Sequence, residues 1–189
     1  MEVDFGVELG ADDETLEIPW GSADNGPTYH DLKRHPEYLS RIKEVLRCPE
    51  LGEFLAGLNS PTTPTETAKC DVWSSTEMNP EEEVFGASHK FGSYVDVLFS
   101  DEARYSFSHH EQFAKDLVQL LRKAPGIPAS AEFLIRRCFY HISGDIREGL
   151  YITIYVFGYG EDEPDAKQRW AIALKLVENA MKQLAGSQR

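Results

Sequence analysis

The sequence has few cysteines, and their spacing matches no metal or redox motif. Only Cys48, Cys70 and Cys138 occur in 189 residues, far apart and without a CxxC pair. An odd number of widely separated cysteines is typical neither of a disulfide framework nor of a zinc knuckle. We therefore interpret all three as reduced, buried thiols. A cysteine nucleophile is the alternative.

Long apolar runs are also missing. No segment approaches the roughly 18 consecutive apolar residues that a membrane span requires. The N-terminal stretch MEVDFGVELGADDE has neither the basic start nor the apolar stretch of a secretory signal. We therefore predict a cytoplasmic protein with no membrane partner. A hydrophobic content of 41% and an aromatic content of 11% suit one packed globular unit of this length.

Positive charge is absent from the first 32 residues, which hold nine acidic residues and no lysine or arginine. The rest of the chain holds 23 acidic and 19 basic residues, so most of the net charge of −13 belongs to this N-terminal part. A negative field repels phosphate backbones and argues against nucleic acid as a partner. We interpret residues 1–27 as a solvated acidic arm, with a hairpin at GADD. A contact with a basic protein surface is the alternative.

Familiar catalytic and cofactor motifs are absent as well. The chain contains no GxSxG, no HExxH, no EF-hand loop and no glycine-rich phosphate loop. The Gly158-Tyr159-Gly160 segment precedes the acidic EDEPD, which suits a helix start and would repel phosphate. The sequence therefore predicts no cofactor and no metal, and it leaves open whether the protein is an enzyme.

Hydrophobic periodicity, which the sequence does have, predicts the architecture. Residues 28–66 show two helical stripes, at 37–47 and 50–58, and then the proline-rich linker NSPTTPTE. Residues 67–189 alternate as strands do at 67–73, 93–99, 131–142 and 150–159, with helices at 108–122 and from Pro164 onward. SGDIREG suits a hairpin loop between the last two strands. The three segments 1–27, 28–66 and 67–189 are expected to form one globular unit.

The predicted fold class is α+β, with an antiparallel sheet of four or more strands and two helices on one face. The order from residue 67 is β-β-α-β-β-α, and an internal duplication is one hypothesis for it. A shift of 57 residues superposes Tyr94 on Tyr151, and Phe113 on Trp170. Two units of apolar pattern are weak evidence for common descent.

Period-two alternation also predicts which side chains share a face. The aliphatic set at Val95, Val97, Ile152 and Ile154 should meet the helices. The opposite set combines aromatic rings with polar groups, the composition of a contact surface. Adjacent residues point to opposite sides, so only one of the two neighbouring arginines at 136 and 137 can belong to it. The candidate ligand-binding or partner-binding residues are Trp73, Tyr94, Asp96, Tyr151, Thr153, Tyr155 and Arg137.

Three coverings suit this second face. The helices of residues 28–66 fold across it, a second copy of the chain packs on it, or it binds a small-molecule ligand. Asp96 is central on this face and needs a partner if it is buried, with Arg136 or Arg137 as candidates. The alternative is a polar anchor in a pocket, or a general base with a raised pKa.

The segment SHHE, residues 108–111, resembles a site but is better explained as a helix start. Ser108 followed by Glu111 before an apolar run is the capping-box pattern. Side chains at adjacent helical positions point about 100° apart, so His109 and His110 do not readily share one metal ion. Metal binding at these two histidines is the alternative.

These observations predict a non-catalytic cytoplasmic binding or assembly protein that acts through the aromatic and polar sheet face or through the acidic arm. The expected partner is a second copy, as a homodimer, or another protein. Two alternatives stay open. One is a small-molecule enzyme with a pocket around Asp96. The other is a metal-dependent hydrolase that uses His109 or His110.

Overall fold

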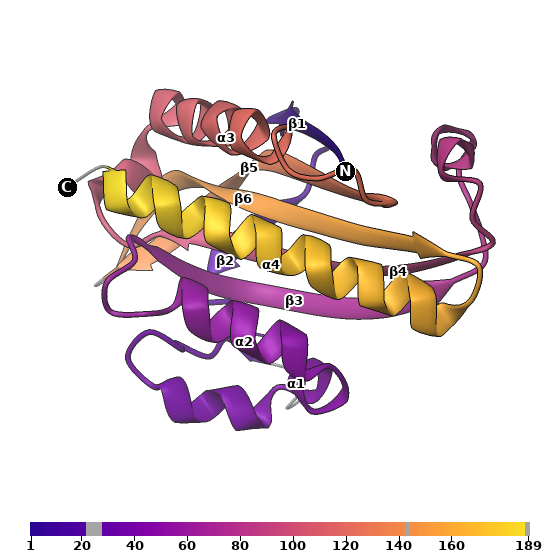
Figure 1. Cartoon of the computed structure of the whole chain (residues 1–189). Coiled ribbons are helices and arrows are strands. Elements are labelled where there is room, and N and C mark those ends of the chain that lie inside the picture. The colour runs from indigo at the N-terminus through magenta and orange to yellow at the C-terminus, as the bar shows by residue number, and fades with distance from the viewer. Residues whose placement is uncertain (22–27, 143, 188–189) are drawn as a thin grey trace.

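The computed structural model describes residues 1–21, 28–142 and 144–187 (Figure 1). Residues 22–27 of the predicted acidic arm, and Ser143 of the predicted hairpin loop, lie outside these residues. The strands are β1 Glu2–Glu8, β2 Thr15–Ile18, β3 Thr65–Ser75, β4 His89–Phe99, β5 Ala129–Ile142 and β6 Asp145–Gly160. The α-helices are α1 Lys43–Arg47, α2 Pro49–Leu58, α3 Phe107–Leu121 and α4 Glu163–Ser187. Three short 3-10 helices are η1 Pro36–Arg41, η2 Pro80–Phe85 and η3 Glu102–Tyr105.

The protein is α+β, and the strands form one mixed sheet in the order β1-β5-β6-β4-β3, with β2 also paired to β5. The pairs β3–β4, β4–β6 and β5–β6 are antiparallel, as predicted, but β1 and β2 both run parallel to β5. The prediction of a purely antiparallel sheet is therefore wrong at this edge. The element order β3-β4-α3-β5-β6-α4 places β4 and β6 side by side at the centre. The internal duplication stays a prediction.

The acidic N-terminal arm is part of the sheet and is not a hairpin. β1 pairs with residues 130–136 of β5, and β2 continues along residues 137–140 of the same strand. Two strands that run in one direction along one neighbour cannot pair with each other through a tight turn. The segment between them loops out instead, with the Gly10 N–H donating to the Asp13 carboxylate.

Helices α3 and α4 cover one face of the sheet (Figure 1). The alternate strand residues predicted for that face, including Val95, Val97, Ile152 and Ile154, are buried in one core with Phe113 and Trp170. The Trp170 indole Nε1 donates to Ser93 Oγ at 2.9 Å, which satisfies the one polar atom of the buried ring. The predicted side of the helices is therefore confirmed.

One interpretation predicted that the helices of residues 28–66 cover the opposite face of the sheet. They do not. Helix α2 lies beside α4 and β3 (Figure 1), and Phe54 and Leu58 belong to the same core as α3 and α4. The short linker after α2 holds it there, because the Asn59 side chain accepts from the Thr67 N–H at 3.0 Å. The Thr65 hydroxyl also donates to the Leu58 carbonyl at 2.9 Å. The helix layer is thus extended past the edge strand β3.

The face opposite α3 and α4 is called here the aromatic face, and described segments of the chain cover it at its two ends. At one end β2 places Leu16 and Ile18 against Leu98, Tyr140 and Tyr151 in a second, small core. At the other end η2 folds over the ends of β4 and β6 through Phe85, whose ring stacks on Tyr159 at 4.2 Å. The part of the aromatic face between its two ends is the candidate site.

Gly158 is a position of close backbone approach between α4 and β6. A Cβ atom added there would lie 2.1 Å from the Trp170 nitrogen and 2.3 Å from the Ala166 carbonyl oxygen, both backbone atoms. At Gly126 an added Cβ meets nothing within 4 Å. The backbone contact at Gly158 therefore tolerates no side chain unless α4 moves away from the sheet.

We expect Gly158→Ala to lower the free energy of unfolding by about 3 kcal/mol, at the upper end of typical overpacking costs, because α4 must shift. Gly126→Ala is the matched control and should change stability by less than about 1 kcal/mol. Urea unfolding followed by circular dichroism measures both. Equal midpoints for the two variants would contradict the close packing of α4 on β6.

Candidate functional site

A single row of side chains crosses the aromatic face with acids at both ends and tyrosines in the middle. The strand pairings align Asp4 of β1, Glu132 of β5, Tyr155 of β6, Tyr94 of β4 and Asp71 of β3. Directly opposed residues on paired strands point to the same face. The alternation predicted from the sequence therefore becomes one continuous row.

The next row adds two more rings around a glycine. Phe157, Gly92 and Trp73 oppose one another on β6, β4 and β3. A Cβ on Gly92 would lie 2.6 Å from the Phe157 ring and 3.2 Å from the Trp73 ring, so the glycine leaves the space that the rings fill. The Trp73 ring centre is 5.8 Å from that of Phe157 and 6.4 Å from that of Tyr94. Trp73, Tyr94, Tyr155 and Phe157 thus form a half-buried aromatic strip.

A chain of polar side chains lies beside the aromatic strip. The Thr153 hydroxyl donates to Asp96 Oδ1 at 2.7 Å and accepts from Arg136 Nη1 at 3.1 Å. Arg136 in turn donates through Nε to Glu8 Oε2 at 2.7 Å and through Nη1 to Glu14 Oε2 at 3.3 Å. The sequence predicted a direct ion pair between Asp96 and an arginine. The structure instead links Asp96 to Arg136 through the Thr153 hydroxyl.

Arg137, the arginine predicted for this face, is the wrong member of the pair. Its side chain donates to the Leu9 carbonyl at 2.8 Å and lies 3.1 Å from Glu148 Oε1, whereas Arg136 lies beside Thr153. The reason is the parity of β5, which turns Phe133 and Ile135 toward the helices and Arg136 away from them. The sequence offered two adjacent arginines and no way to choose between them.

The other predicted residues divide into a surface set and a buried set. Trp73, Tyr94 and Tyr155 lie together in the half-buried strip. Thr153 and Asp96 lie below them and are almost fully buried. Tyr151 belongs to the small core under β2 and is 0% exposed, so it is packed away from any partner on this face.

Burial dominates the ionisation of Asp96. Desolvation raises the pKa of this carboxyl to about 6, and the negative charge of Glu14 adds to the increase. The hydrogen bond from Thr153 and the charges of Lys69 and Arg136 act in the opposite direction. These interactions therefore offset only part of the free-energy cost of burying the Asp96 carboxylate.

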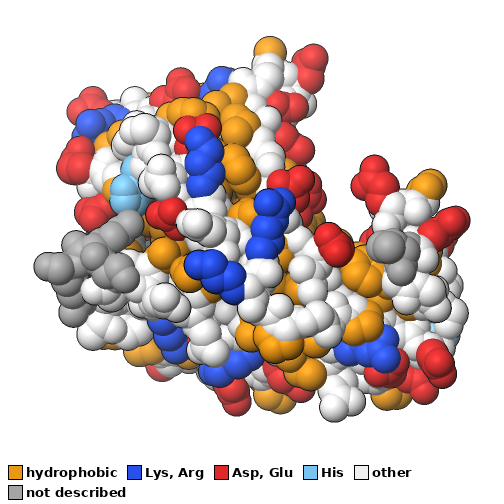
Figure 2. Space-filling view, turned by 45° about the horizontal axis from the view of Figure 1, so that its top comes forward, with side chains coloured by type: hydrophobic (Ala, Val, Ile, Leu, Met, Phe, Trp, Pro, Cys, Tyr) orange, Lys and Arg blue, Asp and Glu red, His pale blue; other side chains and the backbone are white. Residues whose placement is uncertain are grey.

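Acidic groups surround the strip on two sides. Burial raises the pKa of Glu132, and the charges of Glu8 and Asp4 raise it further, as does Glu81 on η2. Figure 2 shows a hollow between the projecting segment that carries η2 and the body of the protein, with acidic side chains on both sides. The surface next to the aromatic strip therefore has a negative potential.

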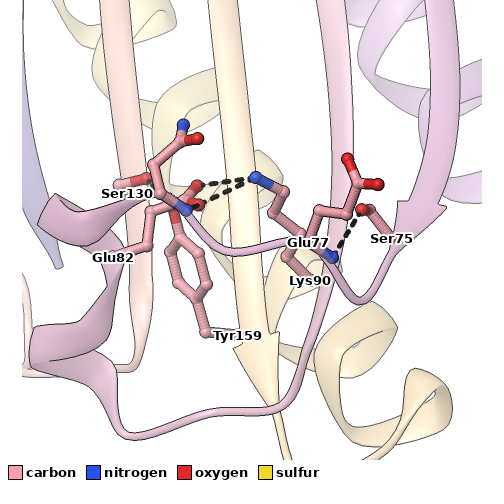
Figure 3. A network of polar contacts seen from close by, with 7 residues as sticks. Ser75, Glu77, Glu82, Lys90, Ser130 and Tyr159 are labelled. Atoms are coloured by element: carbon pink, nitrogen blue, oxygen red, sulfur yellow. Dashed lines mark hydrogen bonds and ion pairs between the residues drawn. The ribbon is translucent and has the colours of Figure 1, made fainter.

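A network that sequence reasoning missed fixes η2 at the end of the strip (Figure 3). Glu82 accepts from Lys90 Nζ at 2.8 Å and from the Tyr159 hydroxyl at 3.0 Å, and that hydroxyl also lies 2.9 Å from Ser130 Oγ. Asn79 and Glu82 form a capping box at the start of η2. Asn followed three residues later by Glu is the pattern that would have revealed this start.

The two adjacent histidines start a helix, but the cap differs from the prediction. The N-cap of α3 is Ser106, whose hydroxyl accepts from the His109 N–H at 3.3 Å, and not Ser108. Glu111 pairs with Lys115 one turn along, so no capping box forms. The His109 and His110 rings both pack edge-on against Phe99. Among the described residues, no group of three or more His, Cys, Asp and Glu side chains is arranged to hold a metal ion.

The fold and site define an α+β protein with a mixed sheet, one face covered by helices and the other by an aromatic strip with an acidic border. Comparison of the chain with family models, characterised proteins and solved structures found no match. Within the described part of the chain, no helix combines the length and apolarity needed to cross a membrane.

The raised pKa of Asp96 predicts a specific pH dependence of stability. The folded state keeps the proton up to about pH 6, whereas an unfolded aspartate loses it near pH 4. The contribution of Asp96 to stability is therefore fully present below pH 4 and is lost as pH rises through 6. For Asp96→Asn this loss is absent, so the variant should gain about 3 kcal/mol relative to the wild type between pH 4 and pH 7.

Urea unfolding at a series of pH values measures the difference. Asp145→Asn, at the exposed start of β6, controls for the loss of one carboxylate. If the Asp96→Asn curve runs parallel to the wild-type curve over the whole range, burial does not raise the pKa of Asp96 in the folded state.

Proposed function

We propose that the protein is a non-catalytic binding protein whose aromatic face contacts a basic segment of a partner protein. The observation that carries this proposal is the row in which tyrosines on β4 and β6 lie between acidic residues at both edges. Aromatic rings supply contact area and carboxylates supply the attraction for cations.

The charges on this face support a cationic partner. Two basic side chains that border the strip are already paired, Arg136 with Glu8 and Lys90 with Glu82. Among the described residues, no lysine or arginine nitrogen lies within 4.0 Å of a carboxylate oxygen of Asp4, Asp71 or Glu132. The negative charge beside the strip is thus left for a partner to neutralise.

The rings favour the same partner. A lysine or arginine attracts the face of an aromatic ring, and the attraction is strongest where the pair is removed from water. Arg136 already lies 5.9 Å from the centre of the Tyr155 ring, and Lys90 lies 5.8 Å from that of Phe157. Further cations from a partner would meet the exposed sides of the same strip.

A second copy of the chain fits this face less well. Two identical acidic faces brought together would repel, and the chain carries a net charge of −13. Charge complementarity therefore favours a basic protein over the homodimer that the predicted aromatic and polar face had suggested.

The small-molecule enzyme is a second candidate, and one observation favours it. Burial raises the pKa of Asp96 to about 6, in the range that suits a general base at neutral pH. Against it, Asp96 is only 3% exposed, and one of its carboxylate oxygens is occupied by Thr153. A base that abstracts a proton must reach its substrate, so the binding function is the better-supported proposal.

The proposal is tested with the indole N–H signals of the three tryptophans in a two-dimensional 1H–15N spectrum. Trp73 lies in the strip, whereas Trp170 is fully buried in the helix-side core. A short peptide of alternating lysine and serine should shift the Trp73 signal in a saturable and salt-sensitive way, and leave Trp170 unchanged. Single Trp→Phe variants assign the signals.

The charge dependence is tested with a matched pair of double variants. Asp71→Asn/Glu132→Gln should weaken binding of the lysine peptide by about fivefold, since each exposed ion pair is worth up to about 1 kcal/mol. Glu53→Gln/Glu163→Gln removes the same charge from exposed positions on α2 and α4 and should leave affinity unchanged. Equal binding of a glutamate-serine peptide, or equal loss in both variants, would refute the proposed face.

A further inference from the structure

We propose that a pocket at the outer edge of β3 is a second binding site, specific for a flat organic anion. The cavity has a volume of about 700 Å3, within the range of small-molecule sites. It is bounded by β3 on one side and by α1, Trp20 and the segment before η1 on the other. It lies beside the aromatic face, and the two surfaces share Tyr94 and Asp71.

A β-bulge in the edge strand shapes this pocket. The pairing of β3 with β4 is interrupted between Thr67 and Cys70, where Ala68 and Lys69 of β3 lie opposite the single residue Asp96 of β4, so β3 has one extra residue. Bulges of this kind bend a strand and redirect a side chain. The Ala68 carbonyl turns to accept the Trp20 indole N–H at 2.8 Å, and the Lys69 nitrogen lies 5.2 Å from the centre of the Trp20 ring. The bulge therefore fixes an aromatic wall and a cation together.

The charged residues that line the pocket have a formal net charge of +1. Arg41, Lys43 and Lys69 line it, against two carboxylates, Glu44 and Asp71. Within the described chain, none of these three basic side chains lies within 4.0 Å of a carboxylate oxygen. A lining with a formal excess of one positive charge, in a chain with a net charge of −13, favours an anion over a cation.

The walls of the pocket select a flat, partly apolar molecule. Trp20 and Tyr94 present rings to the cavity, and Leu32 and Leu55 supply apolar surface. Its lining thus combines stacking surfaces with a few charged groups, the usual composition of a small-molecule site. An aromatic carboxylate matches both features, with its ring between the walls and its anionic group toward Lys43 and Lys69.

Three probes with one ring system and different charge test this assignment: 2-naphthoate, 2-naphthylmethanol and 2-naphthylmethylammonium. The Trp20 indole signal reports on the pocket, because its N–H is hydrogen-bonded at the bulge. Millimolar 2-naphthoate should shift the Trp20 signal in a saturable way while Trp170 stays unchanged. The naphthoate should bind about tenfold more tightly than the ammonium compound, and the alcohol should fall between them.

A matched pair of variants on α1 tests the charge itself. Lys43→Gln should weaken naphthoate binding by about threefold, and addition of Lys69→Gln by tenfold or more. Arg47→Gln removes the same charge one helical turn further along, at an exposed residue outside the pocket lining, and should have no effect. The same spectra show whether each variant is folded.

Two results would overturn the assignment. One is the absence of a saturable Trp20 shift with naphthoate, and the other is binding of the alcohol or the ammonium compound as tight as that of the naphthoate. Because the lysine peptide is read at Trp73 and the naphthoate at Trp20, failure of this proposal is distinguishable from failure of the proposed cationic contact.

Discussion

The contact of α4 with β6 at Gly158 is the constraint on which the rest of the structure depends. Backbone meets backbone there, and Trp170 is anchored to Ser93 on the neighbouring strand. Because side chains alternate along a strand, one such contact assigns every residue of β4 and β6 to a face. The strand neighbours of Tyr94, Asp96, Thr153 and Tyr155 in β4 and β6 pack against the helices. The aromatic face therefore carries these four residues.

The aromatic face contains a buried carboxylate, which is unfavourable without a direct cationic partner. Asp96 is buried without a direct contact to a cation, and the Thr153 hydroxyl bridges it to Arg136 by accepting from Arg136 and donating to Asp96. The same arginine holds two acids, Glu8 and Glu14, from the parallel-paired N-terminal segment. This arrangement links the edge strands to the centre of the sheet and concentrates negative charge beside the rings. The lining of the neighbouring β3 pocket has a formal net charge of +1, so we expect the two surfaces that share Tyr94 to favour different partners.

The strands, the two long helices and the two faces were predictable because each depends on local periodicity. The errors have a common physical origin in long-range contacts. The acidic segment was expected to be solvated, but it adds to an open edge of β5, and no local pattern reports the presence of that edge. One of the three coverings considered for the far face placed helix α2 there, but hydrogen bonds of Asn59 and Thr65 hold it on the near side. The polar network at Glu82 was missed because its members are distant in sequence.

By itself the sequence determined that Tyr94 projects with Asp96, and Thr153 with Tyr155, since a period of two is a property of the extended chain. Only the tertiary structure decided that Arg136 and not Arg137 joins them, because strand parity relative to the helices is set by packing. It also decided that Tyr151 is buried, since β2 arrives from the other end of the chain. Whether a side chain is accessible depends on which distant segment covers it, and that is a property of the folded chain alone.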